Sequence, residues 1–127
     1  MREKAAAGVV WHGADLAMQE RRVEDGLIYT FPGDTLGEAE EPVDTAVRVL
    51  TAELGFPFSR ETFDRVKVLC DAQRAVSFYE VNAPFNSLNL RASEKSRMVL
   101  MSPYRVIKAL QDDMVADLSA EYIGRYL

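Results

Sequence analysis

Carboxylates gather at and just before a segment of this chain that has the pattern of a helix, and carboxylates placed in this way can bind a metal ion. Glu38, Glu40 and Glu41 precede residues 42–54, and Glu53 lies near the end of that segment. Carboxylates one turn apart on a helix converge on one point, and Mg²⁺ needs such hard oxygen ligands in near-octahedral geometry. The alternative is that the acids before the helix only complement its dipole and that Glu53 is an exposed helix carboxylate. The residues alone leave both interpretations open.

Two adjacent arginines, Arg21 and Arg22, could bind the phosphate oxygens of a small ligand, because guanidinium donors suit such oxygens. Neighbouring residues of a strand point to opposite faces, so we expect at most one of the two to serve. Tyr29, Phe78 and Tyr79 could stack on a base, and the alternative for each of these strand aromatics is packing in the core.

The chain offers few other reactive side chains. It has one histidine, His12, and one cysteine, Cys70. A single histidine gives no basis for a Ser/His/Asp or Cys/His arrangement, and zinc has no ligand set here. We expect His12 in a turn or at the surface and Cys70 in the core.

The helix that carries Glu53 is the clearest predicted element. Pro42 suits the first helical position because its missing N–H would be unpaired there, and Gly55 suits a left-handed cap at the end. At the helical period one apolar stripe would pack on a sheet. Its members are Val43, Ala46, Val47, Leu50 and Leu54.

Short β-branched and aromatic runs predict strands around this helix. A long loop is expected at residues 82–96, and loops of that length are often functional or mobile. The whole order predicts an α/β arrangement with helices covering a mixed sheet. The strand candidates are residues 7–11, 16–20, 27–31, 65–69, 75–81 and 97–101, and helical spacing returns at residues 106–110 and 114–127.

Length and composition narrow the class of protein. The 127 residues show no internal repeat or linker, so we expect a single domain over residues 1–127 that can bury a sizeable core. A net charge of −5 argues against duplex nucleic acid as a partner. The apolar run near the N-terminus is too short for a signal peptide or a membrane span, and an unpaired cysteine suits a reducing compartment, so we expect a cytoplasmic location and no membrane partner.

Residues 31–56 resemble the Nudix box, the signature of the Nudix hydrolase superfamily. In that pattern a glycine is followed by five residues, a glutamate, seven residues, and then Arg-Glu, an aliphatic, any residue, Glu-Glu, any residue, glycine and an aliphatic. The lead-in Phe31-Pro32-Gly33 also matches. The register fits without a gap at Glu40, Arg48, Leu50, Glu53 and Gly55, with Phe56 in place of the final aliphatic.

This resemblance implies a Nudix-type α/β/α sandwich with a mixed β-sheet, and a site for a diphosphate-linked small molecule. It implies Mg²⁺ or Mn²⁺ as cofactor if the chain is active, and otherwise none. Together with the residues described above, the resemblance implies catalytic roles for Glu53 and Glu94 and metal binding by Glu53 and Glu40. It implies substrate binding by Arg21, Arg22 and Tyr29. The residues with an implied structural role are Gly33, Glu40, Arg48 and Gly55.

The sequence departs from the Nudix pattern mainly at positions whose side chains bind the metal ion in the family. Val49 and Ala52 stand where the family has glutamates of the metal site, and Asp34 stands where it has the glycine. Val49 and Ala52 supply no oxygen, so Glu53 alone would bind the ion weakly. Aspartate visits left-handed backbone conformations more easily than most residues, so the turn at Asp34 is expected to survive, and Asp34 could return a ligand.

Three functions are compatible with this pattern. The leading hypothesis is a Nudix-like protein that binds a nucleotide or another diphosphate-linked small molecule, with hydrolysis weak or lost. The second is an active divalent-metal-dependent pyrophosphohydrolase with a rearranged site, which requires at least three oxygens from Asp34, Glu38, Glu40, Glu53 and Glu94 to converge. The third is an interaction module with a vestigial cleft, in which the C-terminal residues dock on a partner such as a second copy.

Overall fold

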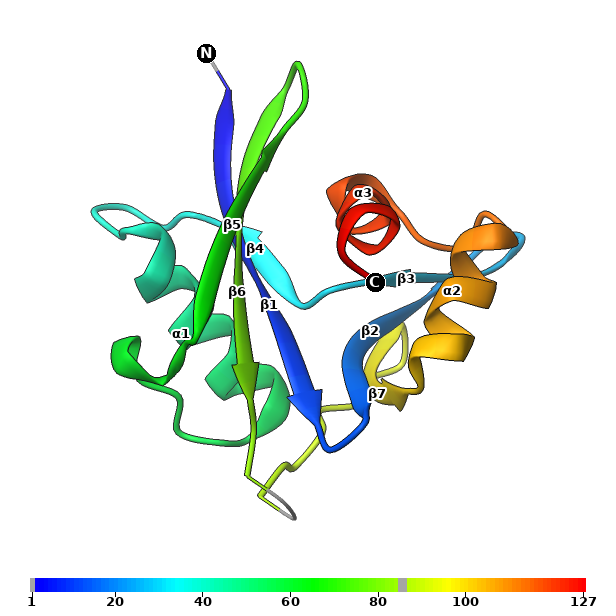
Figure 1. Ribbon diagram of the computed structural model, residues 1–127, viewed down its shortest axis with the longest axis horizontal. Helices are drawn as coiled ribbons and strands as arrows, with labels where there is room; N and C mark the ends of the chain where they lie inside the picture. Colours follow the sequence, from blue (N-terminus) through cyan, green and yellow to red (C-terminus); the bar gives the residue numbers. More distant parts are fainter. Residues whose placement is uncertain (1, 85–86) are drawn as a thin grey trace.

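A seven-stranded mixed sheet forms the centre of the molecule in the computed structural model, which describes residues 2–84 and 87–127. Its strands are β1 (Glu3–His12), β2 (Asp15–Val23), β3 (Gly26–Thr30), β4 (Gly33–Thr35), β5 (Arg65–Cys70), β6 (Arg74–Asn82) and β7 (Ser96–Met101). The strand order is β3-β2-β1-β6-β5, with β4 paired to β1 and β7 paired to β2. β1 and β6 run parallel and the other pairs are antiparallel. Figure 1 shows β1 and β6 side by side while β2 and β7 diverge from them.

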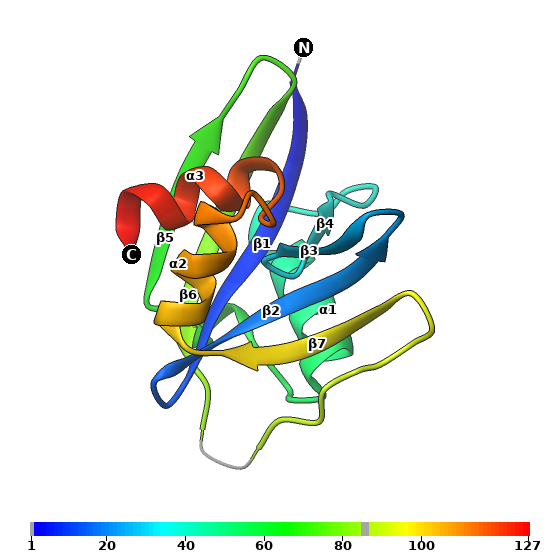
Figure 2. The same cartoon turned by 90° about the vertical axis from the view of Figure 1, so that its right-hand side faces the viewer.

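Helices cover both faces of this sheet. α1 (Pro42–Leu54) packs on one face, and α2 (Pro103–Gln111) and α3 (Asp117–Tyr126) pack on the other (Figure 2). A short 3₁₀ turn, η1 (Arg60–Thr62), follows α1. Two apolar clusters correspond to the two faces, one under α1 and the other under α2 and α3. The predicted α/β/α sandwich with a mixed sheet is therefore confirmed.

α1 has the predicted bounds, for the predicted reasons. Pro42 occupies its first turn, and Gly55 ends it with a φ of 64°, in the left-handed region. The buried face is rotated from the predicted stripe, because Val43 and Val47 are only half-buried. Thr45 takes a core position, where its hydroxyl donates to the carboxylate of Glu40 at 2.8 Å. The residues buried on α1 are Thr45, Ala46, Val49, Leu50 and Leu54.

Gly8 of β1 lets α1 approach the sheet closely. A Cβ at this position would collide with the side chain of Leu50, which is completely buried. We therefore expect Gly8→Val to lower the free energy of unfolding by about 1–3 kcal/mol, the usual cost of overpacking a core. Chemical denaturation would measure this. Gly124→Ala is the control, because a Cβ there meets nothing within 4 Å, and it should stabilise α3 slightly; equal effects of the two changes would contradict the packing argument.

The segment predicted as a long loop is largely packed against α1. Residues 85 and 86 lie outside the described part of it. Asn89 donates its backbone N–H to Leu54 O at 2.7 Å, and a Cβ on Gly55 would lie 2.7 Å from the Cβ of Asn89. Arg91 then pairs with Met98, whose N–H donates to Arg91 O at 2.8 Å, so this part of the chain forms a short hairpin into β7. No helix or strand lies between β6 and β7 among the described residues, as predicted, and the bridge of Ala92 to Arg97 orders the end of this loop.

Three smaller expectations are corrected. Cys70 is exposed, because its alternation along β5 places it on the part of the sheet that α1 does not cover. The last helix begins at Asp117 rather than at Met114, because Met114 O accepts from the N–H of Tyr29 and Val115 bridges to Tyr29. β1 begins earlier than predicted, because β6 pairs with it from Glu3 onward. No helix in the described residues is long and apolar enough to cross a membrane.

Candidate functional site

A cleft with a volume of about 240 Å³ opens between β4, the paired strands β2 and β3, and the first turn of α3. Most of its apolar side chains come from the parallel strands β1 and β6, and its polar side chains come from β2, β3, β4, the start of β6 and α3. The apolar members include Ala5, Ala7, Val76, Phe78 and Phe31, and the polar ones are Gln19, Arg21, Thr30, Asp34, Thr35, Arg74, Asp117 and Ser119. An apolar surface with a few converging polar groups is the usual composition of a small-molecule site.

Arg21 and Arg22 line two different clefts, as expected for neighbouring residues of a strand. Arg21 lines this cleft, whereas Arg22 lines a second cleft of about 460 Å³ beside β7. This separation follows from the alternation of side chains along β2. Arg21 is thus the predicted phosphate contact that the structure brings to the cleft.

Arg74 is a second cation of the cleft, and it was not predicted from the sequence. Its Nε is buried and has no hydrogen-bond partner among the described residues. The carboxylates of Glu3 and Asp117 lie 3.6 Å from Nε and 3.8 Å from Nη1 respectively, so both ion pairs are loose. Only the parallel pairing of β1 with β6 places Arg74 here, and nothing local to residue 74 indicates that pairing.

The start of α3 forms one wall of the cleft and is fixed by polar contacts. Ser119 Oγ accepts the backbone N–H of Phe31 at 3.1 Å. Asp117, the first residue of α3, has a φ of 59°. A left-handed conformation is uncommon for a non-glycine residue and is often found at functional sites.

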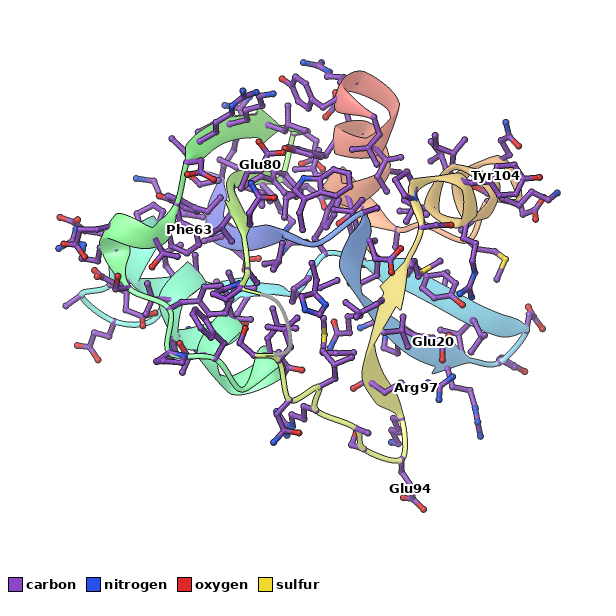
Figure 3. All side chains as sticks on the ribbon, turned by 60° about the horizontal axis from the view of Figure 1, so that its bottom comes forward. Glu20, Phe63, Glu80, Glu94, Arg97 and Tyr104 are labelled. Atoms are coloured by element: carbon purple, nitrogen blue, oxygen red, sulfur yellow. The ribbon has the colours of Figure 1, made fainter. Side chains whose placement is uncertain are left out.

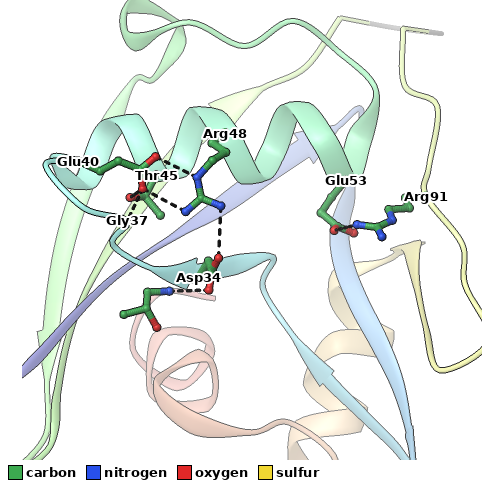
Figure 4. A network of polar contacts seen from close by, with 8 residues as sticks. Asp34, Gly37, Glu40, Thr45, Arg48, Glu53 and Arg91 are labelled. Carbon is green, nitrogen blue, oxygen red and sulfur yellow. Dashed lines mark hydrogen bonds and ion pairs between the residues drawn. The ribbon is translucent and has the colours of Figure 1, made fainter.

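The carboxylate of Glu40 holds the loop before α1 to the helix (Figure 4). It accepts from the N–H of Gly37 at 2.7 Å, the hydroxyl of Thr45 at 2.8 Å, and Arg48 at 2.9 and 3.1 Å. The hydrogen bond from Arg48, then those from Gly37 and Thr45, lower the pKa of Glu40 to about 2. These contacts occupy both oxygens of Glu40, as expected of a structural residue and unlike a metal ligand.

This network predicts a pH dependence. Because the pKa of Glu40 is depressed below the ordinary 4.5, its contribution to stability is present above pH 4.5 and is lost as the pH falls towards 2. We expect the difference in free energy of unfolding between the unmodified chain and Glu40→Gln to shrink across that range, as measured by urea denaturation at stepped pH. Arg48→Gln should remove much of the same pH dependence. A difference that stays constant from pH 5 to pH 2 would contradict the assignment.

Asp34 differs from its expected conformation. It lies within β4 and is not among the described residues with positive φ, so it does not use left-handed backbone. Its carboxylate accepts the N–H of Thr35 at 2.8 Å and contacts Arg48 at 3.3 Å. Gly33 beside it is required by close packing, because a Cβ there would lie 2.6 Å from Ala6 O.

Glu53 is paired with a cation of the protein itself. Its carboxylate accepts from Arg91 Nη1 at 3.1 Å (Figure 4), and its side chain is only 18% exposed. Val49 is buried, and neither its side chain nor the methyl group of Ala52 carries a polar atom. Across residues 2–84 and 87–127 no group of three His, Cys, Asp or Glu side chains could hold a metal ion. This donor set does not fit the divalent ion that the resemblance implies.

The remaining predicted site residues lie elsewhere. Tyr29 is buried in the core, and its hydroxyl donates to Glu20 at 2.7 Å. Burial would raise the pKa of Glu20, but hydrogen bonds from Tyr29 and Arg97 outweigh it and lower that pKa. Glu94 lies at the tip of the hairpin before β7, pointing away from the molecule in Figure 3, and lines the second cleft beside Glu20. Glu53 lines neither of these two clefts.

Solved structures identify the fold. No family model and no curated protein matches the sequence. A Nudix hydrolase from Nitrosomonas europaea matches with a TM-score of 0.71 at 16% identity, covering 99% of this chain and 88% of that one. A structure of MutT from work on Aliivibrio salmonicida and Vibrio cholerae gives 0.65 at 16%, covering 99% and 100%. A bifunctional NMN adenylyltransferase/ADP-ribose pyrophosphatase from Francisella tularensis, complexed with AMP and a manganese ion, gives 0.64 at 14%, covering 90% and 42%. The chain has the fold of the Nudix hydrolases.

Proposed function

We propose that this protein binds a nucleotide or another diphosphate-linked small molecule in the cleft between β2, β4 and α3, and that hydrolysis is weak or lost. The observation that carries the proposal is the composition of the cleft. Its apolar strands suit a base or another flat group, while Arg21 and Arg74 supply donors for phosphate oxygens. The unpartnered Nε of Arg74 is a donor that a ligand oxygen would satisfy.

The carboxylates of α1 and of the loop before it support the proposed loss of hydrolysis. A metal-assisted attack on a diphosphate needs an ion that is held by several oxygens and left open to substrate. Glu40 is occupied by Gly37, Thr45 and Arg48, and Glu53 is occupied by Arg91. The rearranged metal site required for an active hydrolase has no converging set of three acids in the described residues.

A binding experiment tests the first half of the proposal. Thermal shift and calorimetry against ADP and nucleotide sugars should show stabilisation, since a ligand that binds the native state raises its apparent stability. Arg21→Gln and Arg74→Gln should each weaken binding about tenfold, the loss expected for a charge-assisted hydrogen bond. Arg22→Gln is the matched control on the same strand and should have no effect.

A turnover assay tests the second half. A nucleoside-diphosphate panel with Mg²⁺ or Mn²⁺ should give little product. Robust cleavage that disappears in Glu53→Gln would reject the loss of activity and favour the active pyrophosphohydrolase. If none of the ligands binds to the unmodified chain, the cleft is vestigial and the chain is better explained as an interaction module.

A further inference from the structure

We infer that Arg91 is a built-in cation of the ligand site, so that phosphate binding by this protein needs no divalent metal. The inference rests on the proposed function and concerns the chemistry of the same ligand. It starts from the Glu53–Arg91 pair, in which the one carboxylate left at the family's metal positions on α1 is neutralised by a guanidinium. The N–H donors of that guanidinium that are not bonded to Glu53 are then open to a phosphate without recruitment of an ion.

A row of cross-strand neighbours leads from the cleft to Arg91. Thr30 and Gln19, which both line the cleft, pair between β3 and β2, and Gln19 pairs with Met98 of β7. Met98 donates its N–H to Arg91 O at 2.8 Å, which adds Arg91 to the row. Residues directly opposite in a sheet point to one face. At about 4.8 Å per strand, the backbone of Arg91 is about 10 Å from that of Gln19, within reach of an arginine side chain and an extended diphosphate.

The backbone around Arg91 holds it in place. Its N–H donates to Glu53 O at 2.9 Å, and the neighbouring Asn89 donates to Leu54 O at 2.7 Å. Gly55 allows this approach because it has no side chain. The position of Arg91 is therefore set by the end of α1 rather than by its ion pair alone.

The exposure of the two partners favours an anion-binding role. The Glu53 side chain is 18% exposed, whereas that of Arg91 is 62% exposed. A guanidinium has five N–H donors, and one of them is accounted for by the bond to Glu53. In this pair the carboxylate of Glu53 is therefore largely covered, and the guanidinium of Arg91 is open to a ligand.

A purely structural role makes a different prediction. If Arg91 served only to neutralise Glu53 at the negative end of α1, then replacing either residue would change the affinity for the ligand by the same factor. If Arg91 binds the phosphate, then removing Glu53 leaves the cation in place and spares binding. The two single variants separate these roles.

The experiment is calorimetric titration of the full chain with ADP and with inorganic pyrophosphate, in EDTA and in Mg²⁺. For the unmodified chain we expect dissociation constants that agree within about twofold between the two conditions. Arg91→Gln should bind each ligand about tenfold more weakly, and Arg91→Lys should keep part of the affinity. Glu53→Gln should bind at least as tightly as the unmodified chain. Arg125→Gln, an exposed arginine with one ion pair to Glu121, is the matched control and should bind normally. Thermal melts confirm that each variant is folded.

Three results would overturn the inference while leaving the proposed function intact: binding that tightens tenfold or more with Mg²⁺, unchanged binding by Arg91→Gln, or equal losses in Arg91→Gln and Glu53→Gln. Absence of binding to the unmodified chain in both conditions overturns the proposed function, and this inference with it.

Discussion

Ala52→Glu combined with Arg91→Gln should bind Mn²⁺ about a hundredfold more tightly than the unmodified chain. The double variant adds an acid beside Glu53 and removes the cation that neutralises it. One unit of charge about 4 Å from a divalent ion changes its binding by about 2 kcal/mol in water, and two such changes, reduced by salt screening, correspond to about a hundredfold. Ala52 is exposed, so a glutamate there stays solvated, whereas Val49 is buried and is left unchanged.

Electron paramagnetic resonance of free Mn²⁺ measures this gain directly. Glu53→Gln added to the double variant should remove most of it, because only one introduced carboxylate then remains. If the unmodified chain binds Mn²⁺ as tightly as the double variant, the metal site was never lost, and the Glu53–Arg91 pair does not prevent metal binding.

The second large effect is expected for Tyr122→Ala, which should lower the free energy of unfolding by about 3–5 kcal/mol. Tyr122 is 1% exposed, and its ring contacts those of Phe31 and Phe78, with centroids 5.4 and 4.8 Å away. These rings attach α3 to the sheet beneath the cleft. For a domain of this size the loss corresponds to a fall in Tm of about 10–20 °C.

Differential scanning calorimetry would measure that fall, with two controls on the same helix. Tyr122→Phe keeps the ring and should change stability little. Tyr126→Ala removes a ring that is 42% exposed and packs against Tyr122 and Lys67, so it should cost much less. A similar loss for Tyr126→Ala would mean that burial of the ring is not the dominant cause.

Local signals made much of the fold predictable. The bounds of α1 follow from Pro42 and Gly55. The resemblance to the Nudix box implied both a structural and a metal-binding role for Glu40, and the hydrogen bond from Arg48 fits the first of them. The buried face of α1 did not follow from apolar periodicity, because Thr45 is buried through a hydrogen bond to Glu40 rather than through its hydrophobicity.

The charges of the candidate site were less predictable, because partners far apart in the sequence set them. Arg74 reaches the cleft only through the pairing of β6 with β1, and Arg91 meets Glu53 only through a hairpin that packs on the end of α1. No pattern near residue 74 or 91 indicates these contacts. The lack of metal-binding oxygens at Val49 and Ala52 could be predicted, because it depends only on the residue types and not on contacts between distant parts of the chain.

The parallel pairing of β1 with β6 also constrains how the chain can fold during synthesis. Glu3 pairs with Arg74 and Trp11 with Asn82, so each contact closes a span of 71 residues. Such distant contacts make folding slow. At a translation rate of about 5–20 residues per second, the alanine- and valine-rich first strand waits several seconds, on the ribosome, for its neighbour.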